Sequence, residues 1–177
     1  MERLLRPLDN LLNKVTMYRL MLYYVTALYS LAIIFSFFKL LPYNPIDLLA
    51  SGMYLIGICF AVNQIVARLF KVQPNYESQL ITGTILALII GPLPLFSNLL
   101  FLTIAASLSM VSKYLLVYKK QHIFNPAAFA VTITALTLSN GASWWIGSPL
   151  LLPFFAILGL IMSRKLRSFH LVLSFVF

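Results

Sequence analysis

The stretch Lys119–Val131, with the sequence KKQHIFNPAAFAV, places an Asn-Pro pair between a basic cluster and a short apolar run. Pro126 has no backbone N–H and suits the first position of a helix, and Asn125 before it is a favoured N-cap residue. The pair therefore predicts a helix that begins at the aqueous edge of an apolar segment. The N-terminus of such a helix carries unpaired N–H groups and a partial positive charge, which suits an anionic or acceptor-rich ligand. The alternative interpretation is that Asn125 and Pro126 only open a membrane-spanning helix.

The composition indicates a polytopic membrane protein. Of the 177 residues, 61% are hydrophobic and 10% are charged, and the mean hydropathy is +0.93. Soluble domains carry about 25% charged residues. The net charge of +9 would suggest a nucleic-acid partner for a soluble chain, but here the basic residues stand at the ends of apolar runs, where they indicate topology. We therefore expect a lipid bilayer around the chain and no nucleic-acid partner.

Apolar segments recur at regular intervals along the chain. They cover about 21–41, 46–69, 79–93, 96–118, 125–138 and 144–162, and a last one opens at Phe169. The first, second, fourth and sixth segments are near the roughly 20 residues that a spanning helix needs. The third and fifth are short, and short segments interrupted by Gly or Pro are typical of binding sites in transporter-type folds.

The basic residues favour a cytoplasmic N-terminus. If every segment crosses the membrane, all lysines and arginines except Lys39 fall on the side of the N-terminus. If the third segment instead folded back as a re-entrant loop, Lys119 and Lys120 would move outside, against the positive-inside rule. The sequence therefore predicts an all-α protein of the plasma (inner) membrane. Residues 1–20 form an amphipathic cytoplasmic segment, and 21–177 form one domain with about six spans and the start of a seventh.

Polar and aromatic residues inside the apolar segments have ordinary structural interpretations. Asn63 and Gln64 are expected to form hydrogen bonds between helices. The small residues over 82–84 allow another helix to approach closely. Trp144 and Trp145 fall where an interfacial aromatic belt is expected.

No catalytic set or metal-binding spacing is visible. The sequence has no Ser/His/Asp arrangement and no phosphate loop, and none of its four acidic residues falls in the middle of a segment. Its single cysteine, Cys59, cannot hold an iron–sulfur cluster alone. Any redox chemistry must therefore belong to a bound cofactor, which the protein positions.

Two strings resemble motifs of one membrane protein family. The string HIFNPAA over 122–128 is similar to the family's "N-P-F-N-P-A" element, and ESQLITGTILAL over 77–88 is similar to its "D/N-x-S-A-L-L-T-G-L-L-L-A-L" element. The family comprises the D subunit of the Rnf ferredoxin:NAD oxidoreductase and the B subunit of the sodium-pumping NADH:quinone oxidoreductase. The resemblance runs from about Leu48 to the end of the chain, and the two motifs keep the family's order and separation.

This resemblance implies a urea-transporter-like half-fold with short, interrupted helices. It also implies an electron-transfer subunit of a flavin-dependent, ion-translocating oxidoreductase rather than a self-contained enzyme. Asn125 and Pro126 would lie near a riboflavin or FMN site at the cytoplasmic side, with Thr82 and Gly83 facing the cofactor. The implied partners are other subunits of a membrane redox complex or a second copy of the half-fold.

The chain departs from the family in two places. The family attaches FMN covalently to a threonine in a segment resembling "D-G-x-S-x-A-T-P", whereas the corresponding segment here, SNGAS over 139–143, has no threonine. Thr137, the nearest threonine, is expected inside a helix, so any flavin should be bound non-covalently. The chain also ends at Phe177 within an apolar run, which suggests a truncated or reduced member. A non-redox transport or scaffold protein that retains the half-fold is the alternative.

A half-fold also predicts that some helix ends have unpaired backbone groups. The short segments end near Gly91 and Ser139, and backbone groups exposed there cannot be satisfied by lipid. We expect these ends to lack bonding partners within the chain. The protein would then need a second copy or another subunit to be stable.

Overall fold

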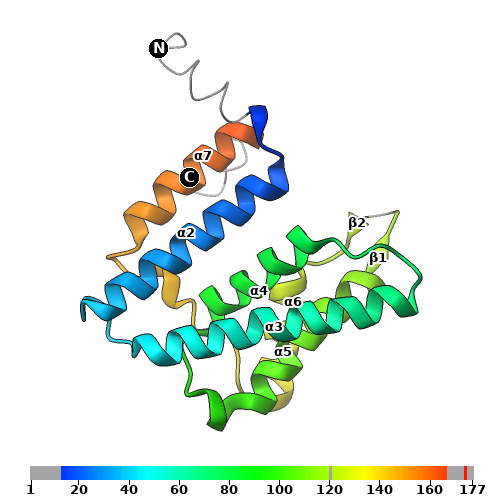
Figure 1. Ribbon diagram of the computed structural model, residues 1–177, viewed down its shortest axis with the longest axis horizontal. Helices are drawn as coiled ribbons and strands as arrows, with labels where there is room; N and C mark the ends of the chain where they lie inside the picture. The colour runs from blue at the N-terminus through cyan, green and yellow to red at the C-terminus, as the bar shows by residue number, and fades with distance from the viewer. Residues whose placement is uncertain (1–12, 120, 167–173, 175–177) are drawn as a thin grey trace.

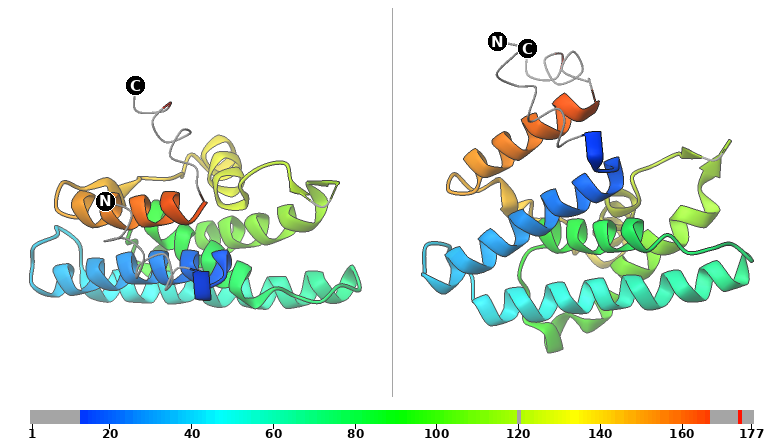
Figure 2. Two further views of the ribbon diagram at one scale, coloured as in Figure 1. Left: turned by 90° about the horizontal axis from the view of Figure 1, so that it is seen from above. Right: turned by 45° about the horizontal axis from the view of Figure 1, so that its top comes forward.

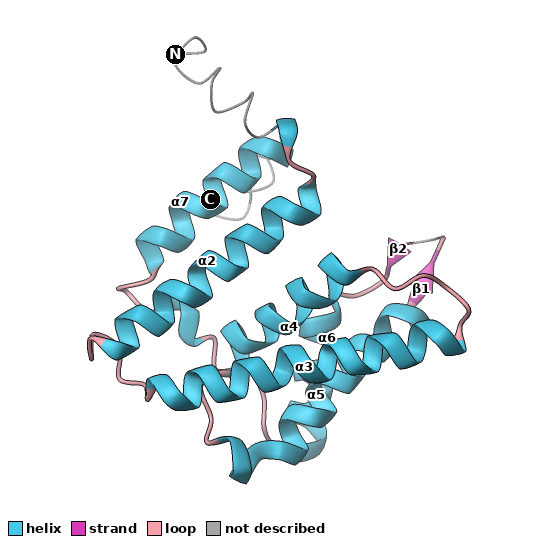
Figure 3. Cartoon of the chain, viewed as in Figure 1, coloured by secondary structure: helices cyan, strands magenta, loops and turns pink. Residues whose placement is uncertain are grey.

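The computed structural model describes residues 13–119, 121–166 and 174. Within this part the chain is helical apart from one short β-hairpin (Figure 1, Figure 3). The elements, in chain order, are helices α2 (Met17–Phe37), α3 (Pro45–Leu69), α4 (Tyr76–Ile90) and α5 (Leu95–Leu115), strands β1 (Val117–Tyr118) and β2 (Gln121–His122), helix α6 (Pro126–Leu138), the 3-10 turn η1 (Trp145–Gly147) and helix α7 (Leu152–Leu166). The predicted all-α class is confirmed. The urea-transporter-like half-fold and the number of spans stay predictions.

Two parts of the sequence prediction fall on residues that are not described. Most of the amphipathic segment over 1–20 lies in the undescribed residues 1–12. Of the segment that opens at Phe169, only Ser174 is described.

Within the described residues, three helices are long and apolar enough to cross a membrane. They are α2, α3 and α5, with 21, 25 and 21 residues. Large apolar side chains are exposed along the outside of the bundle, among them Ile46, Leu100 and Phe96, which is 89% exposed. Such a surface would be unfavourable in water but suits contact with lipid, so the structure supports a membrane protein.

Asparagine side chains fix where three of the helices begin. Asn44, Asn75 and Asn125 stand directly before α3, α4 and α6, and each accepts a hydrogen bond of 2.9–3.0 Å from a backbone N–H of the first helical turn. In α3 and α6 the next residue is a proline, Pro45 and Pro126. The helix start predicted at Asn125-Pro126 is therefore confirmed.

The short helix α4 is the centre of the bundle. It contacts α2, α3, α5, α6 and η1. Seen from above, α2 and α3 lie on one side of the molecule and α6 and α7 on the other (Figure 2). The side chains of α4 are buried on every face, and the buried residues are Gln79, Ile81, Thr82, Gly83, Thr84, Leu86, Ala87, Leu88, Ile89 and Ile90. A helix that is apolar all round belongs in a core, so burial rather than length explains why α4 can be short.

The sixth predicted segment, 144–162, is not one continuous helix. Trp144 has a left-handed backbone conformation with φ of 51°, η1 follows it, and α7 begins only at Leu152. Pro149 explains the break, because it has no N–H and keeps the residue before it out of the helical region. Ser148 is accordingly extended, with ψ of 146°.

The C-terminal end of α4 is bonded by the loop that follows α6. The backbone N–H groups of Ser143 and Trp144 donate to Ile89 O at 2.8 and 3.0 Å. The prediction that the end near Gly91 lacks partners is therefore wrong, since the chain itself supplies the donors. Ser139 ends α6 in a left-handed conformation, and the corresponding prediction for that end stays a prediction.

Trp145 also helps to complete the C-terminal end of α4 and does not lie in an interfacial belt. Its side chain is 5% exposed, and its Nε1 donates to Ala87 O at 3.1 Å. Its ring packs edge-on against Tyr43, with the ring centroids 5.3 Å apart. Trp144, in contrast, is 62% exposed, as an interfacial tryptophan would be. The aromatic-belt prediction is thus wrong for Trp145.

Candidate functional site

A cavity of about 170 Å³ lies at the end of the bundle where α6 begins, and we call it the Asn125 cavity. Its walls come from α2, α4, α5 and the first residues of α6. The lining residues are Met17, Tyr18, Met21, Ser78, Ile81, Thr82, Ile85, Lys113, Asn125 and Pro126. Three of the four residues that the family resemblance proposes for cofactor binding, Thr82, Asn125 and Pro126, thus meet in one place.

The Asn125 side chain has two functional ends. Its Oδ1 accepts hydrogen bonds from the backbone N–H groups of Ala127 and Ala128, at 3.0 and 3.3 Å. Its Nδ2 has no hydrogen-bond partner among the described residues. Capping of the helix and donation to a ligand therefore use different atoms of Asn125, and both can occur together.

Thr82 and Pro126 offer limited chemistry. The Thr82 hydroxyl donates to Ser78 O at 2.9 Å, so toward the cavity it can only accept a hydrogen bond. Pro126 has no N–H and adds an apolar ring to the wall.

Gly83 serves helix packing. A Cβ at this position would lie 2.9 Å from the Cα of Ile56, so the missing side chain allows α4 to approach α3 closely. Gly83 is not among the residues that line the Asn125 cavity. It faces α3, while Thr82 beside it in the sequence lines the cavity.

Lys113 is the functional candidate that the sequence analysis did not single out. Its Nζ donates to Ser78 O at 2.8 Å and to Ser78 Oγ at 3.0 Å, which places a partly buried ammonium between α5 and the first turn of α4. An ammonium has three donors, so one is available to a ligand in the Asn125 cavity. The signal in the sequence was a lysine inside the apolar stretch 96–118, because an ionisable residue within a membrane segment points to function. From the sequence, Lys113 contributes only to the predicted topology.

A network of buried amides joins α3, α4 and α5 next to Lys113. Asn63 Nδ2 donates to Gln79 Oε1 at 2.6 Å, and the Tyr114 hydroxyl donates to Asn63 Oδ1 at 2.8 Å. The interhelical hydrogen bonding predicted for Asn63 is confirmed. Gln79 is 1% exposed, and its Nε2 has no partner among the described residues.

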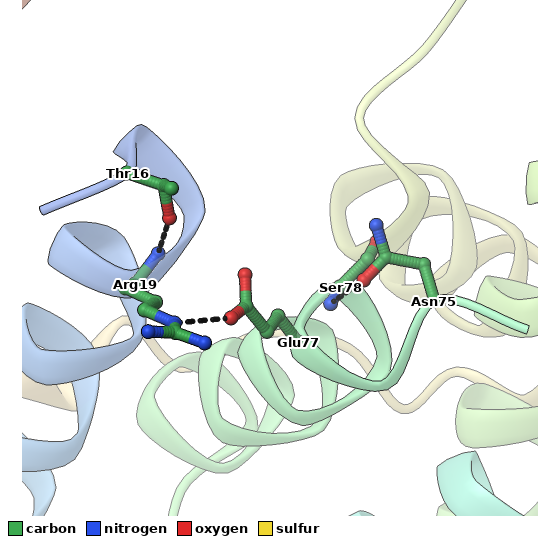
Figure 4. Close-up of polar contacts among 5 residues, drawn as sticks. All are labelled: Thr16, Arg19, Asn75, Glu77 and Ser78. Atoms are coloured by element: carbon green, nitrogen blue, oxygen red, sulfur yellow. Dashed lines mark hydrogen bonds and ion pairs between the residues drawn. The ribbon is translucent and has the colours of Figure 1, made fainter.

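An ion pair joins the first turns of α2 and α4 (Figure 4). Arg19 Nε donates to Glu77 Oε1 at 2.9 Å, while Thr16 caps α2 and Asn75 caps α4 beside it. Glu77 lies in the first turn of α4. The pair marks where the start of α2 lies beside α4, and there α2 supplies one wall of the Asn125 cavity.

A larger apolar cavity of about 390 Å³ adjoins the Asn125 cavity. It lies between α2, α4 and the η1–α7 region, and the two cavities share Met21 and Ile85. Its lining includes the aromatic side chains of Tyr24, Trp144 and Phe155. Met21 and Ile85 therefore lie between the polar end of the bundle and an apolar space.

Among the described residues, no group of three His, Cys, Asp or Glu side chains is placed to hold a metal ion. In comparisons with known proteins, no family model, no curated protein and no solved structure matches this chain. The resemblance to the Rnf and Nqr membrane subunits therefore rests on the two sequence motifs alone.

Proposed function

We propose that the chain is a membrane-embedded electron-transfer subunit of the Rnf/Nqr type, which holds a flavin non-covalently at the Asn125 cavity. One observation carries this proposal. Thr82 and Asn125, which come from the two separate motifs, line one cavity together with the ammonium of Lys113. A bound flavin supplies one- and two-electron transfer, and the protein supplies position and electrostatics.

The polar groups of the cavity suit the edge of a flavin ring that carries both acceptors and an N–H donor. Asn125 Nδ2 and the remaining donor of Lys113 can bind ring oxygens, and the Thr82 hydroxyl can accept from an N–H. The positive charge of Lys113 favours the form of the ligand that holds more electrons, because opposite charges attract strongly where little water is present. These residues would therefore both orient the ring and raise its affinity for electrons.

The size of the site adds a requirement. At about 170 Å³ the Asn125 cavity is smaller than the roughly 300–1,000 Å³ of cavities that bury whole organic ligands. The adjoining apolar cavity of about 390 Å³ would have to take the rest of the ring system. Met21, which lines both cavities, has a flexible side chain that adapts to such a ligand. The apolar walls would keep water away from the ring.

The proposed orientation puts the N-terminus and this site at the cytoplasmic side of the plasma (inner) membrane. Arg19 and Lys113 both contact the first turn of α4, so these basic residues share one end of the bundle. Lys39 lies at the opposite end of α2. A cysteine replacing Gln121 should resist labelling from outside intact cells, and a cysteine replacing Lys39 should react. Labelling of position 121 from outside would overturn this orientation.

A matched pair of asparagines tests the flavin proposal. Asn125→Asp keeps a capping oxygen but removes the Nδ2 donor and adds a negative charge, so the purified full-length chain should lose most of its visible flavin absorbance. Asn125→Ser should lose less. Both variants should unfold within a few tenths of a kcal/mol of wild type, because Asp and Ser cap as well as Asn. Asn44→Asp is the control, since Asn44 caps α3 before Pro45 but lies outside the cavity.

Two results would contradict the proposal. Equal flavin content in all four proteins would reduce Asn125 to a helix cap. A colourless wild-type protein would favour the non-redox transport or scaffold interpretation.

The proposed attachment is non-covalent. Thr137 lies in α6, where its hydroxyl donates to Ile133 O at 2.8 Å, and it is outside the Asn125 cavity. A denaturing gel should therefore show no flavin fluorescence at the band of the protein. A fluorescent band would refute this part of the proposal.

A further inference from the structure

A second polar cavity, of about 180 Å³, shares Ser78 and Lys113 with the Asn125 cavity, and we call it the Lys113 cavity. It lies between the C-terminal halves of α3 and α5, the start of α4 and the β-hairpin. Every residue that lines it is polar and none is acidic. Gln73, Asn75 and His122 line this cavity but not the Asn125 cavity, so the two sites can be changed separately.

The charge of Lys113 is not balanced by a carboxylate within the described part of the chain. Glu77, the nearest acid in the sequence to Ser78, points to Arg19 and pairs with it (Figure 4). Asp47 lies in the first turn of α3, whereas Asn63 of the Lys113 cavity lies near the other end of that helix. Among the described residues, the Lys113 ammonium bonds only the carbonyl and hydroxyl oxygens of Ser78, which are neutral. A cation in such surroundings favours the binding of an anion.

The start of α4 adds positive potential at the same place. Asn75 caps this 15-residue helix by accepting from Ser78 N at 3.0 Å, and both residues line the Lys113 cavity. The N-terminus of a helix carries a partial positive charge and is a common anion site. The N-terminus of α4 and the ammonium of Lys113 therefore both contribute positive potential to the Lys113 cavity.

Asn63, which lines the cavity, is fixed by two hydrogen bonds. Asn63 is held on both sides, by Tyr114 at its oxygen and by Gln79 at its nitrogen. The Nε2 of Gln79, behind Asn63, is buried and has no acceptor among the described residues.

We propose that the Lys113 cavity binds a phosphate group, either as free phosphate or as the head group of an anionic phospholipid. A volume of about 180 Å³ is below the roughly 300–1,000 Å³ of cavities that bury whole organic ligands, and it can hold a single phosphate group. Lysine and helix N-termini are both established phosphate binders. The site stands at the end of the bundle that carries Lys119 in the β-hairpin, and lipid phosphates lie at the corresponding level of a membrane. This inference needs no flavin and goes beyond the proposed function.

The test uses the full-length chain purified in an uncharged detergent, at constant ionic strength. Thermal unfolding is followed while inorganic phosphate is titrated, and in a second arm while phosphatidylglycerol or phosphatidylcholine is added. The variants are Lys113→Met, Lys113→Arg, His122→Leu and the control Lys39→Met, which removes an exposed lysine at the other end of the molecule. Wild type and Lys39→Met should be stabilised equally. Lys113→Met should bind at least about tenfold more weakly, because it loses a charge-assisted hydrogen bond, and Lys113→Arg should keep most of the affinity.

The two arms identify the source of the phosphate group. Stabilisation by inorganic phosphate identifies free phosphate, and stabilisation by phosphatidylglycerol alone identifies the lipid head group. The proposal is overturned if neither ligand stabilises wild type, or if Lys113→Met responds as wild type does. Should Lys113→Met not fold, His122→Leu decides, because His122 is exposed on the hairpin and an unchanged affinity there would also overturn the proposal. Thr82 lines the Asn125 cavity but not the Lys113 cavity, so Thr82→Val should leave the phosphate response of the flavin-free protein intact.

Discussion

Helices α4 and α6 begin alike and end in different surroundings. Both are short and apolar, with 15 and 13 residues, and both start at an asparagine cap. Helix α4 is buried on all faces, and its last carbonyl groups are bonded by the loop after α6. Helix α6 is buried only along a stripe, and Leu136 on its other side is 79% exposed.

The spacing of the buried residues explains the difference. In α6 the buried residues are Ala127, Ala130, Val131 and Thr134, which recur every three or four positions and form one face against α5. In α4 no such stripe exists. A short apolar helix can therefore be either the core of a membrane bundle or its edge. The position of such a helix depends on how many other helices and loops of the chain pack around it.

The largest effect is expected from filling the contact between α4 and α3. Gly83→Leu would place a side chain against the backbone of Ile56, and we expect the free energy of unfolding to fall by about 3 kcal/mol. Gly57→Leu on α3 is the control, because a Cβ there has no atom within 4 Å. It should be neutral or stabilising by up to about 1 kcal/mol, since leucine favours helix more than glycine does. Denaturation in mild detergent measures both, and equal losses would contradict a central position of α4.

The next effect tests the cap at the other end of α4. Trp145→Phe removes the donor to Ala87 O and should cost about 1–3 kcal/mol, the usual penalty for a buried group left unpaired. Trp144→Phe, at an exposed position, should stay within about 0.5 kcal/mol of wild type. If the two tryptophan variants are equally stable, the loop after α6 does not stabilise α4.

A smaller effect compares the two asparagine caps. Asn75→Ala and Asn125→Ala should each cost about 1 kcal/mol, because each removes one capping oxygen. Only Asn125→Ala should also lower the flavin content, measured by absorbance of the purified protein. A loss of flavin in both variants would mean that the caps affect binding through overall stability.

The smallest effect is expected for the ion pair between α2 and α4. The Arg19 and Glu77 side chains are 62% and 33% exposed, and exposed pairs contribute little because water and salt screen them. Arg19→Gln should leave the unfolding temperature close to that of wild type at physiological salt. A large decrease would show that α4 depends on its connection to α2 more than on its burial.

Local sequence signals predicted the start of α6 well. The Asn-Pro pair at 125–126 acts through hydrogen bonds within one helical turn, so the residues that decide the structure are adjacent in the sequence. The hydrogen bonding of Asn63 was also predictable in kind, because a buried amide inside a helix needs a partner. Its actual partners, Gln79 and Tyr114, were not.

What the sequence did not show depends on contacts between distant residues. Lys113 meets Ser78 across 35 positions, and Trp145 meets Ala87 across 58. No periodicity reports such a contact. The interpretation of Trp145 as interfacial followed from its position alone, and it failed because the loop turns inward to complete α4. The meeting of Thr82 with Asn125 was suggested only by the family motifs.

The cap on α4 has a consequence for how the protein is made. The donors that complete this helix are synthesised late, with Ser143 standing 53 residues after Ile90. At 5–20 residues per second, the ribosome needs about 3–10 s to cover that distance. During this interval the last carbonyl groups of α4 must be bonded by water, by the insertion machinery or by a chaperone, because lipid cannot bond them. Membrane insertion of α4 is therefore expected to finish only after α6 has emerged.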